Sequence, residues 1–141
     1  MKVYLSPQKP EADYNAWISN IATLDGQVLD SEATQIIADQ FLSMFNYNEV
    51  DQIISKISRK MRLGCELIII EPDFNLISQQ YIRDDFSLGD INDILFNGSY
   101  IKSVLTLEEI IHRLPAHNLS ISQKSFNSQS AQMTIKCRRE T

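Results

Sequence analysis

Glycine is scarce in this chain of 141 residues, which has four glycines and none before Gly26. Several catalytic and nucleotide-binding motifs need glycine at fixed positions, and the sequence has neither a Gly-x-Ser-x-Gly nucleophile elbow nor a Walker-type phosphate loop. The two cysteines lie far apart, so there is no Cys-x-x-Cys motif. The sequence therefore does not indicate an α/β-hydrolase, a P-loop nucleotide hydrolase or a thioredoxin-like oxidoreductase.

Long apolar runs and an excess of positive charge are also missing. No run approaches the ~20 apolar residues that span a bilayer, and residues 1–6 are too few for the apolar part of a signal peptide. We therefore expect a cytoplasmic protein that does not contact a membrane. The formal net charge of −5 argues against nucleic-acid binding, which needs a basic surface.

The two cysteines, Cys65 and Cys137, are each flanked by strand-forming residues. This setting predicts buried, reduced thiols. A zinc site needs more ligands at closer spacing, so no metal site is predicted.

The order of the segments predicts one α/β domain over residues 1–141, with a mostly parallel sheet and an antiparallel C-terminal hairpin. Asp25-Gly26 is a turn signal, and Val28-Leu29 is at most a short edge strand. The expected strands are residues 2–5, 16–21, 35–39, 66–70, 119–126 and 131–138.

Three expected helices begin with a capping signal, a polar residue followed three positions later by an acidic one. Gly64 is expected to end the first of them, and Lys60 in its last turn suits the helix dipole. The three capping pairs are Asn46 with Glu49, Ser87 with Asp90, and Thr106 with Glu109.

Two segments in the middle of the chain carry a resemblance to a known family. Thr34–Val50 reads as an apolar strand, a few polar residues and an apolar-rich stretch, and Met61–Phe74 reads as an apolar strand ending in Pro-Asp-Phe. In order and spacing they resemble the fourth and fifth strands of small class I S-adenosylmethionine-dependent methyltransferases of the type 11-like kind. Leu63 and Cys65 stand where that family commonly has proline and glycine. With the first strand and the hairpin, the resemblance covers roughly two thirds of the chain.

The resemblance implies a compact Rossmann-like sheet of seven strands, with the first strand central and the last antiparallel beside the fifth. It places Cys65 and Cys137 near the same end of neighbouring strands. It implies a transferase that uses S-adenosylmethionine to methylate a small molecule or a glycan. Methyl transfer depends mainly on positioning donor and acceptor, so no catalytic base is required and no catalytic residue is predicted.

The same resemblance places the cofactor site outside the carboxyl ends of the first and fourth strands, where the strand order reverses. The alternative interpretation of the acidic candidates after the fifth strand is a solvated rim, and that of Phe41 is a place in the core. The candidate cofactor contacts are Ser6, Pro7, Asn20, Asp39 and Gln40, and the candidate substrate contacts are Phe41, Glu71 and Asp73.

The sequence departs from the family in its cofactor loop. The family needs glycine there because the backbone approaches the cofactor closely, whereas residues 6–10 hold no glycine, and Pro7 and Pro10 have no N–H. Asn20 stands where the family has the acidic residue that receives the ribose hydroxyls. A second hypothesis is therefore a catalytically inactive interaction or regulatory module that no longer binds the cofactor. A third, a receiver-like α/β protein, lacks the acidic pair and the lysine that it needs.

Only about 25 residues separate Leu5 from Asp30, too few for two helical crossovers. One face of the sheet is therefore expected to be thinly covered near the first two strands. Exposed apolar surface there predicts a homodimer or a partner subunit.

Overall fold

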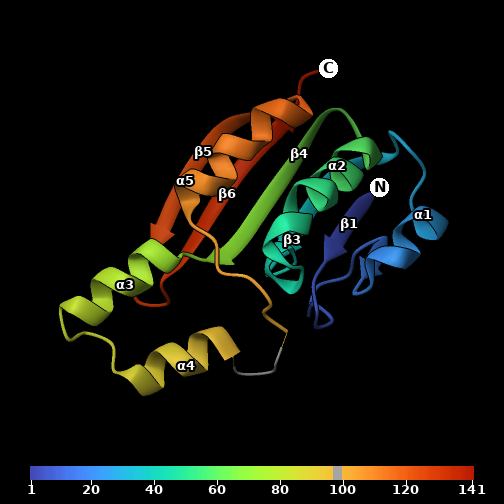
Figure 1. Ribbon diagram of the computed structural model, residues 1–141. Coiled ribbons are helices and arrows are strands. Elements are labelled where there is room, and N and C mark those ends of the chain that lie inside the picture. The colour runs from blue at the N-terminus through green and yellow to red at the C-terminus, as the bar shows by residue number, and fades with distance from the viewer. Residues whose placement is uncertain (97–99) are drawn as a thin grey trace.

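The computed structural model describes residues 1–96 and 100–141, in which strands and helices alternate and a hairpin closes the chain (Figure 1). The strands are β1 (Lys2–Leu5), β2 (Ala16–Ile18), β3 (Ala33–Asp39), β4 (Met61–Pro72), β5 (Leu119–Asn127) and β6 (Gln132–Arg139). The α-helices are α1 (Leu24–Gln27), α2 (Val50–Lys60), α3 (Phe74–Ile82), α4 (Leu88–Phe96) and α5 (Leu107–Arg113).

The six strands form one mixed sheet in the order β2-β1-β3-β4-β6-β5. β1 pairs in parallel with β2 and β3, and β3 pairs in parallel with β4. β6 runs antiparallel to both β4 and β5. The predicted α/β class, the inner position of the first strand and the antiparallel hairpin are thereby confirmed.

The stretch between β2 and β3 differs from expectation. Val28-Leu29 forms no strand, so the described sheet has six strands rather than seven. Asp25-Gly26 lies within α1 instead of forming a turn. β2 ends at Ile18, because Asn20 caps a 3₁₀ helix by accepting a hydrogen bond from the Ala22 N–H at 3.0 Å.

The capping prediction holds at two of the three helix starts. At α4 the Asp90 N–H donates to the Ser87 hydroxyl at 3.1 Å, and the Ser87 N–H donates to the Asp90 carboxylate at 2.8 Å. At α5 the Glu109 N–H donates to the Thr106 hydroxyl at 3.2 Å. Asn46 makes no side-chain cap bond, because a 3₁₀ turn intervenes before α2. No helix among residues 1–96 and 100–141 is long and apolar enough to cross a membrane.

The beginning of β4 also departs from expectation. α2 ends at Lys60, before the expected stop at Gly64, which lies in β4 with a φ of +80° that glycine adopts without strain. Cys65 and Cys137 are free and buried on the neighbouring strands β4 and β6, as predicted.

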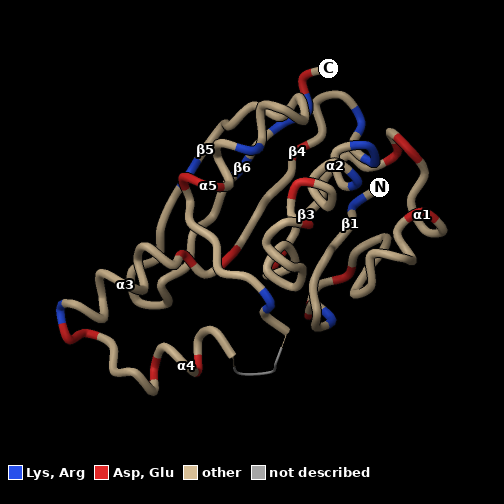
Figure 2. The backbone as a smooth tube through the Cα atoms, viewed as in Figure 1, with Lys and Arg blue, Asp and Glu red and all other residues tan. Residues whose placement is uncertain are grey.

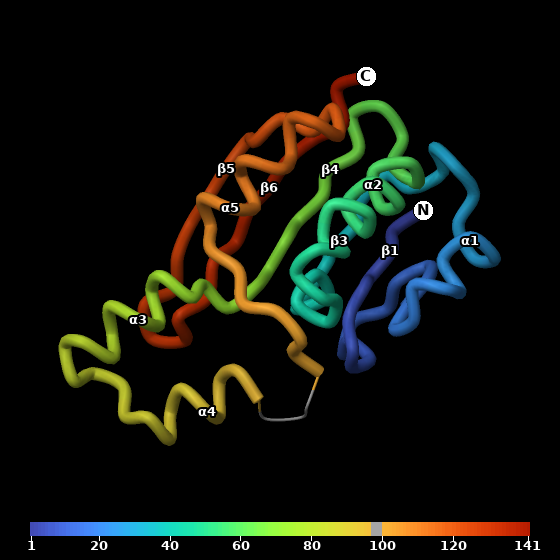
Figure 3. The backbone as a smooth tube through the Cα atoms, viewed as in Figure 1, coloured from blue at the N-terminus to red at the C-terminus, as the bar shows by residue number. Residues whose placement is uncertain are grey.

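α3 and α4 pack on each other beyond the end of β4 and away from the sheet (Figure 3). Their small apolar cluster centres on Ile77, Leu95 and Ala131. α3 has no counterpart among the expected helices, although Asp73 is a capping residue and accepts a hydrogen bond from the Asn75 N–H at 3.0 Å.

The two faces of the sheet differ because successive side chains of a strand point to opposite sides. One face forms the main core together with α1, α2 and α5, and its strand residues include Val3, Leu5, Ile36, Ala38, Leu67 and Ile69. The apolar side chains of the other face lie outside both apolar clusters. We call this second surface the open face; its apolar residues are Tyr4, Trp17, Ile37, Ile68 and Ile70.

Lys60 joins α2 to α1 through an ion pair that the sequence analysis missed. Its ammonium is buried and lies 2.8 Å from a carboxylate oxygen of both Asp25 and Asp30. Figure 2 shows acidic positions on α1 and on the chain after it, and basic positions at the facing end of α2. Burial lowers the pKa of Lys60, but the two carboxylates outweigh it and leave that pKa raised.

We expect Asp25→Asn combined with Asp30→Asn to destabilise the protein more than Lys60→Met. The double variant leaves a buried ammonium without a counter-ion, whereas the single variant leaves two carboxylates that water already reaches. Urea unfolding of the three proteins gives the comparison. Methionine keeps the apolar stem, so a larger loss in Lys60→Met would show that the ammonium stabilises the fold even without its two counter-ions.

Candidate functional site

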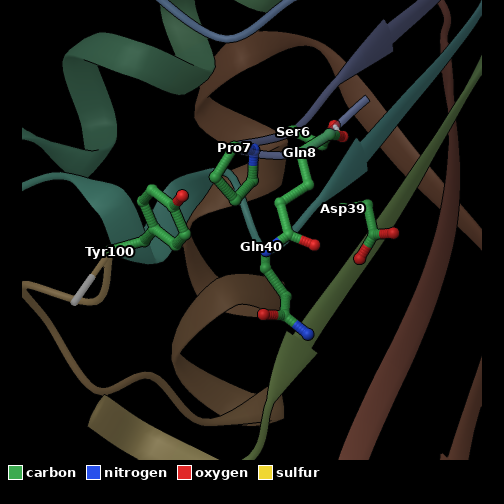
Figure 4. A pocket seen from close by; sticks show the side chains of 6 residues that line it. All are labelled: Ser6, Pro7, Gln8, Asp39, Gln40 and Tyr100. Carbon is green, nitrogen blue, oxygen red and sulfur yellow. Dashed lines mark hydrogen bonds between the residues drawn. The ribbon is translucent and has the colours of Figure 1, made fainter. Parts of the chain in front are cut away.

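A cleft lies outside the carboxyl ends of β1 and β3, where the strand order reverses (Figure 4). Its volume is about 160 Å³. Ser6, Pro7 and Gln8 line it from the loop after β1, Asp39 and Gln40 from the end of β3. The ring of Tyr100 forms a further wall. The structure thus brings together four of the five candidate cofactor contacts.

The Asp39 carboxylate is already engaged within the chain. The Tyr4 hydroxyl donates to Asp39 Oδ2 at 2.6 Å. Burial, followed by this hydrogen bond and the negative charge of Asp39, raises the pKa of Tyr4 well above its ordinary value. Tyr4 therefore stays a hydrogen-bond donor, and one of the two Asp39 oxygens is committed to it.

The Ser6 hydroxyl holds the loop rather than facing a ligand. Ser6 is buried, and its hydroxyl donates to the carbonyl oxygen of Gln8. The Trp17 indole N–H lies 3.3 Å from the Ser6 carbonyl oxygen and 3.2 Å from its hydroxyl oxygen, and donates to this pair. The Ser6 backbone N–H donates to Ile18 O at 3.1 Å. These bonds tie the loop after β1 to β2.

Asn20, the fifth cofactor candidate, lies elsewhere. It lines a separate hollow with Met44, Phe45 and Lys102. Its side-chain oxygen is committed to the Ala22 N–H. Because β2 ends early and the chain turns into a 3₁₀ helix, the predicted convergence of Asn20 with Ser6 and Asp39 does not occur in this structure.

The three candidate substrate contacts do not line the cleft. Phe41 has no exposed surface and packs edge-on against Phe45, with ring centroids 5.3 Å apart. Asp73 is buried at the start of α3, where desolvation raises its pKa against the opposing effect of backbone N–H groups. Neither side chain offers a surface to a substrate.

Glu71 is fully buried because its place in β4 gives it the same orientation as the core residues Leu67 and Ile69. Its Oε2 accepts a hydrogen bond from the Ser43 N–H at 3.3 Å, and its Oε1 has no partner among residues 1–96 and 100–141. Burial raises the pKa of this carboxyl to about 8. Because both carboxyl groups are buried, the interpretation of Glu71 and Asp73 as a solvated rim is wrong.

Sequence reasoning missed Tyr4, Gln8 and Tyr100 as cleft residues or their partners. Tyr4 could be found only with the register of the sheet: it pairs with Ile37, which shares a face with Asp39 two residues later. Tyr100 carries no such signal, because it is far from the other cleft residues in the sequence and lies in no described strand or helix.

No family model and no curated protein matches this sequence. Solved structures do match. An S-adenosylmethionine-dependent methyltransferase from Methanosarcina mazei aligns over 94% of this chain and 70% of its own, with a TM-score of 0.63 and 15% identity. The chain has a methyltransferase fold. Magnesium protoporphyrin IX methyltransferase from Synechocystis, solved with S-adenosylhomocysteine, aligns over 89% of this chain and 51% of its own (TM-score 0.57, 15% identity).

A chain from a complex between a methyltransferase activator and a putative methyltransferase of Haloferax volcanii aligns over 92% of this chain and 64% of its own. Its TM-score is 0.60 and its identity 7%. The protein thus spans from half to about two thirds of these methyltransferase-fold structures.

The residues present do not fit S-adenosylmethionine, the cofactor that a methyltransferase fold implies. Clefts for ligands of drug size begin at about 300 Å³, roughly twice the volume found here. Within residues 6–10 the two prolines have no N–H and that of Ser6 is used, so only Gln8 and Lys9 have a backbone N–H to offer. The position expected to receive the ribose, Asn20, is outside the cleft and lacks a charge.

Proposed function

We propose that this chain is a single methyltransferase-fold domain that works in the cytoplasm without S-adenosylmethionine, as an interaction module. One observation carries the proposal: the hydrogen-bonding groups of the loop after β1 bind within the loop and to β2, and so hold the loop against β2. Groups that are hydrogen-bonded within the chain are not available to hold a cofactor, whereas the surface of the sheet remains available to a partner. A fold can keep its architecture while its function changes in this way.

The uncovered sheet supports the same proposal. The open face presents apolar side chains that a methyltransferase-like sheet with helices on both faces would bury. Trp17 is 37% exposed there. Apolar surface that no helix of the described chain covers is typical of a protein that binds a macromolecular partner.

The second candidate function is methylation of a small molecule or a glycan with S-adenosylmethionine as the donor. The position of the cleft at the reversal of strand order favours it, as does the likeness to an enzyme solved with S-adenosylhomocysteine. In that function Asp39 and Gln40, with Ser6 and Pro7, would be the residues to contact the cofactor.

We expect isothermal titration with S-adenosylhomocysteine at millimolar concentration to give no binding heat, and thermal unfolding to be unchanged. A ligand present at a hundred times its dissociation constant stabilises the folded state by about 2.7 kcal/mol, which a thermal scan detects readily. Binding that Asp39→Asn abolishes and the exposed-loop control Asp13→Asn preserves would overturn the proposal in favour of the methyltransferase.

A further inference from the structure

The open face is built from three rows of side chains that run across the strands. The middle row follows from the register of the sheet: Trp17 pairs with Tyr4, Tyr4 with Ile37, and Ile37 with Ile68. Lys136 of β6 continues the row beside Ile68. Four neighbouring strands therefore present one apolar stripe that ends in a positive charge. The Tyr14 ring, from the loop between β1 and β2, packs on its β1 part with its centroid 4.8 Å from that of Tyr4.

Polar rows flank this stripe on both sides. One consists of Lys2, Gln35, Glu66 and Arg138, and the other of Asp39, Ile70, Thr134 and Ser125. The three rows together carry three basic and two acidic side chains, although the whole chain has a net charge of −5. A surface with nearly balanced charge does not by itself repel a second copy, whereas the whole chain, with a net charge of −5, would.

The size of the open face also fits a second copy. Six strands about 4.8 Å apart and three rows about 6.6 Å apart make a surface of roughly 600 Å² once the side chains at its margins are included. Two such surfaces bury about 1,200 Å², the lower limit for stable, specific interfaces. Two sheets with apolar inner faces pack in this way in β-sandwiches, about 10 Å apart.

We propose that the open face is a homodimer interface, in which two copies stack their sheets about a two-fold axis parallel to the strands and between β3 and β4. This arrangement sets Ile37 opposite Ile68 of the second copy, and Tyr4 opposite Lys136 of the second copy. The first contact is apolar, and the second places a cation beside the packed rings of Tyr4 and Tyr14. The inference names the partner of the proposed interaction module and rests on that proposal.

Sedimentation equilibrium of the full chain tests the dimer. We expect a mass of twice the monomer's 16.2 kDa at micromolar concentration. Ile68→Lys should lower the mass to that of the monomer, because it buries a charge without a partner at the centre of the interface. Ile82→Lys, the same change at an exposed position on α3, should leave the dimer intact. A monomeric native chain, or equal masses for the two variants, would overturn the proposal.

A cysteine experiment keeps the orientation testable even if Ile68→Lys does not fold. Lys2→Cys and Arg138→Cys, at exposed positions that the proposed axis sets opposite each other, are prepared separately, mixed and treated with a bis-maleimide that spans about 10 Å, the distance between stacked sheets. The native Cys65 and Cys137 are buried. We expect the mixture to form a cross-linked dimer joining one copy of each variant. Cross-links that form as well within each variant alone would rule out the proposed axis. Binding of S-adenosylhomocysteine would refute the proposed function without changing these masses, so the two failures can be told apart.

Discussion

Glu71→Gln is expected to make the protein more stable at high pH and to remove most of the loss of stability that the native chain shows as the pH rises. Burial raises the pKa of the Glu71 carboxyl from 4.5 to about 8. Between these two values the folded state holds a proton that the unfolded state has released. Stability therefore falls as the pH rises from about 4.5 to about 8, and levels off above that range.

The expected size of this effect follows from the shift. One pKa unit corresponds to about 1.4 kcal/mol, so the fall across the range is on the order of 3 to 5 kcal/mol. Glutamine is neutral at every pH and keeps an oxygen for the Ser43 N–H, so Glu71→Gln should be nearly independent of pH in this interval.

Urea unfolding at pH 5, 7 and 9 measures the effect, with Glu11→Gln in the exposed loop after β1 as the matched control. The control should keep the native dependence on pH. The same slope in Glu71→Gln and in the native chain would mean that another group causes it, and that Glu71 reaches water.

Phe41→Ala is expected to cost about 3 to 5 kcal/mol of unfolding free energy, the usual loss when a fully buried aromatic ring is removed. The Phe41 ring has no exposed surface, and the substitution also removes its edge-on contact with Phe45. Phe126→Ala, at a ring that is 55% exposed, should change stability by less than about 0.5 kcal/mol.

Thermal and urea unfolding of the two variants separate the two interpretations of Phe41. A large loss of stability assigns the ring to the core, as the structure does. A small loss in Phe41→Ala, comparable with that in Phe126→Ala, would restore Phe41 as a candidate for ligand contact.

Much of the local structure was predictable because local signals dominate it. The capping pairs at α4 and α5 are satisfied within four residues of chain, and the apolar spacing of α2 buries Val50, Ile53, Ile54 and Ile57. The strands of the sheet were likewise found from runs of β-branched residues, apart from their ends. α3 has no counterpart among the expected helices, because Pro-Asp-Phe resembles the end of a strand.

The candidate site was predictable in its place but not in its details. That Ser6 and Asp39 meet follows from two parallel strands ending side by side. That Asn20 turns away, that Glu71 points into the core and that Tyr4 binds Asp39 depend on where β2 ends and on which way each strand faces. A shift of one residue in a strand reverses every side chain, so such assignments need the register.

The sequence by itself determined the α/β class, the parallel core with its terminal hairpin, and the absence of glycine from the loop after β1, because each depends on residues close together in the chain. The thin cover over one face of the sheet was also expected from the short chain before β3. Only the tertiary structure decided that this loop binds itself to β2 and that Lys60 is paired with carboxylates from a separate segment. These features are contacts between residues from separate segments of the chain. They form, and stabilise the protein, only once the sheet has brought those segments together.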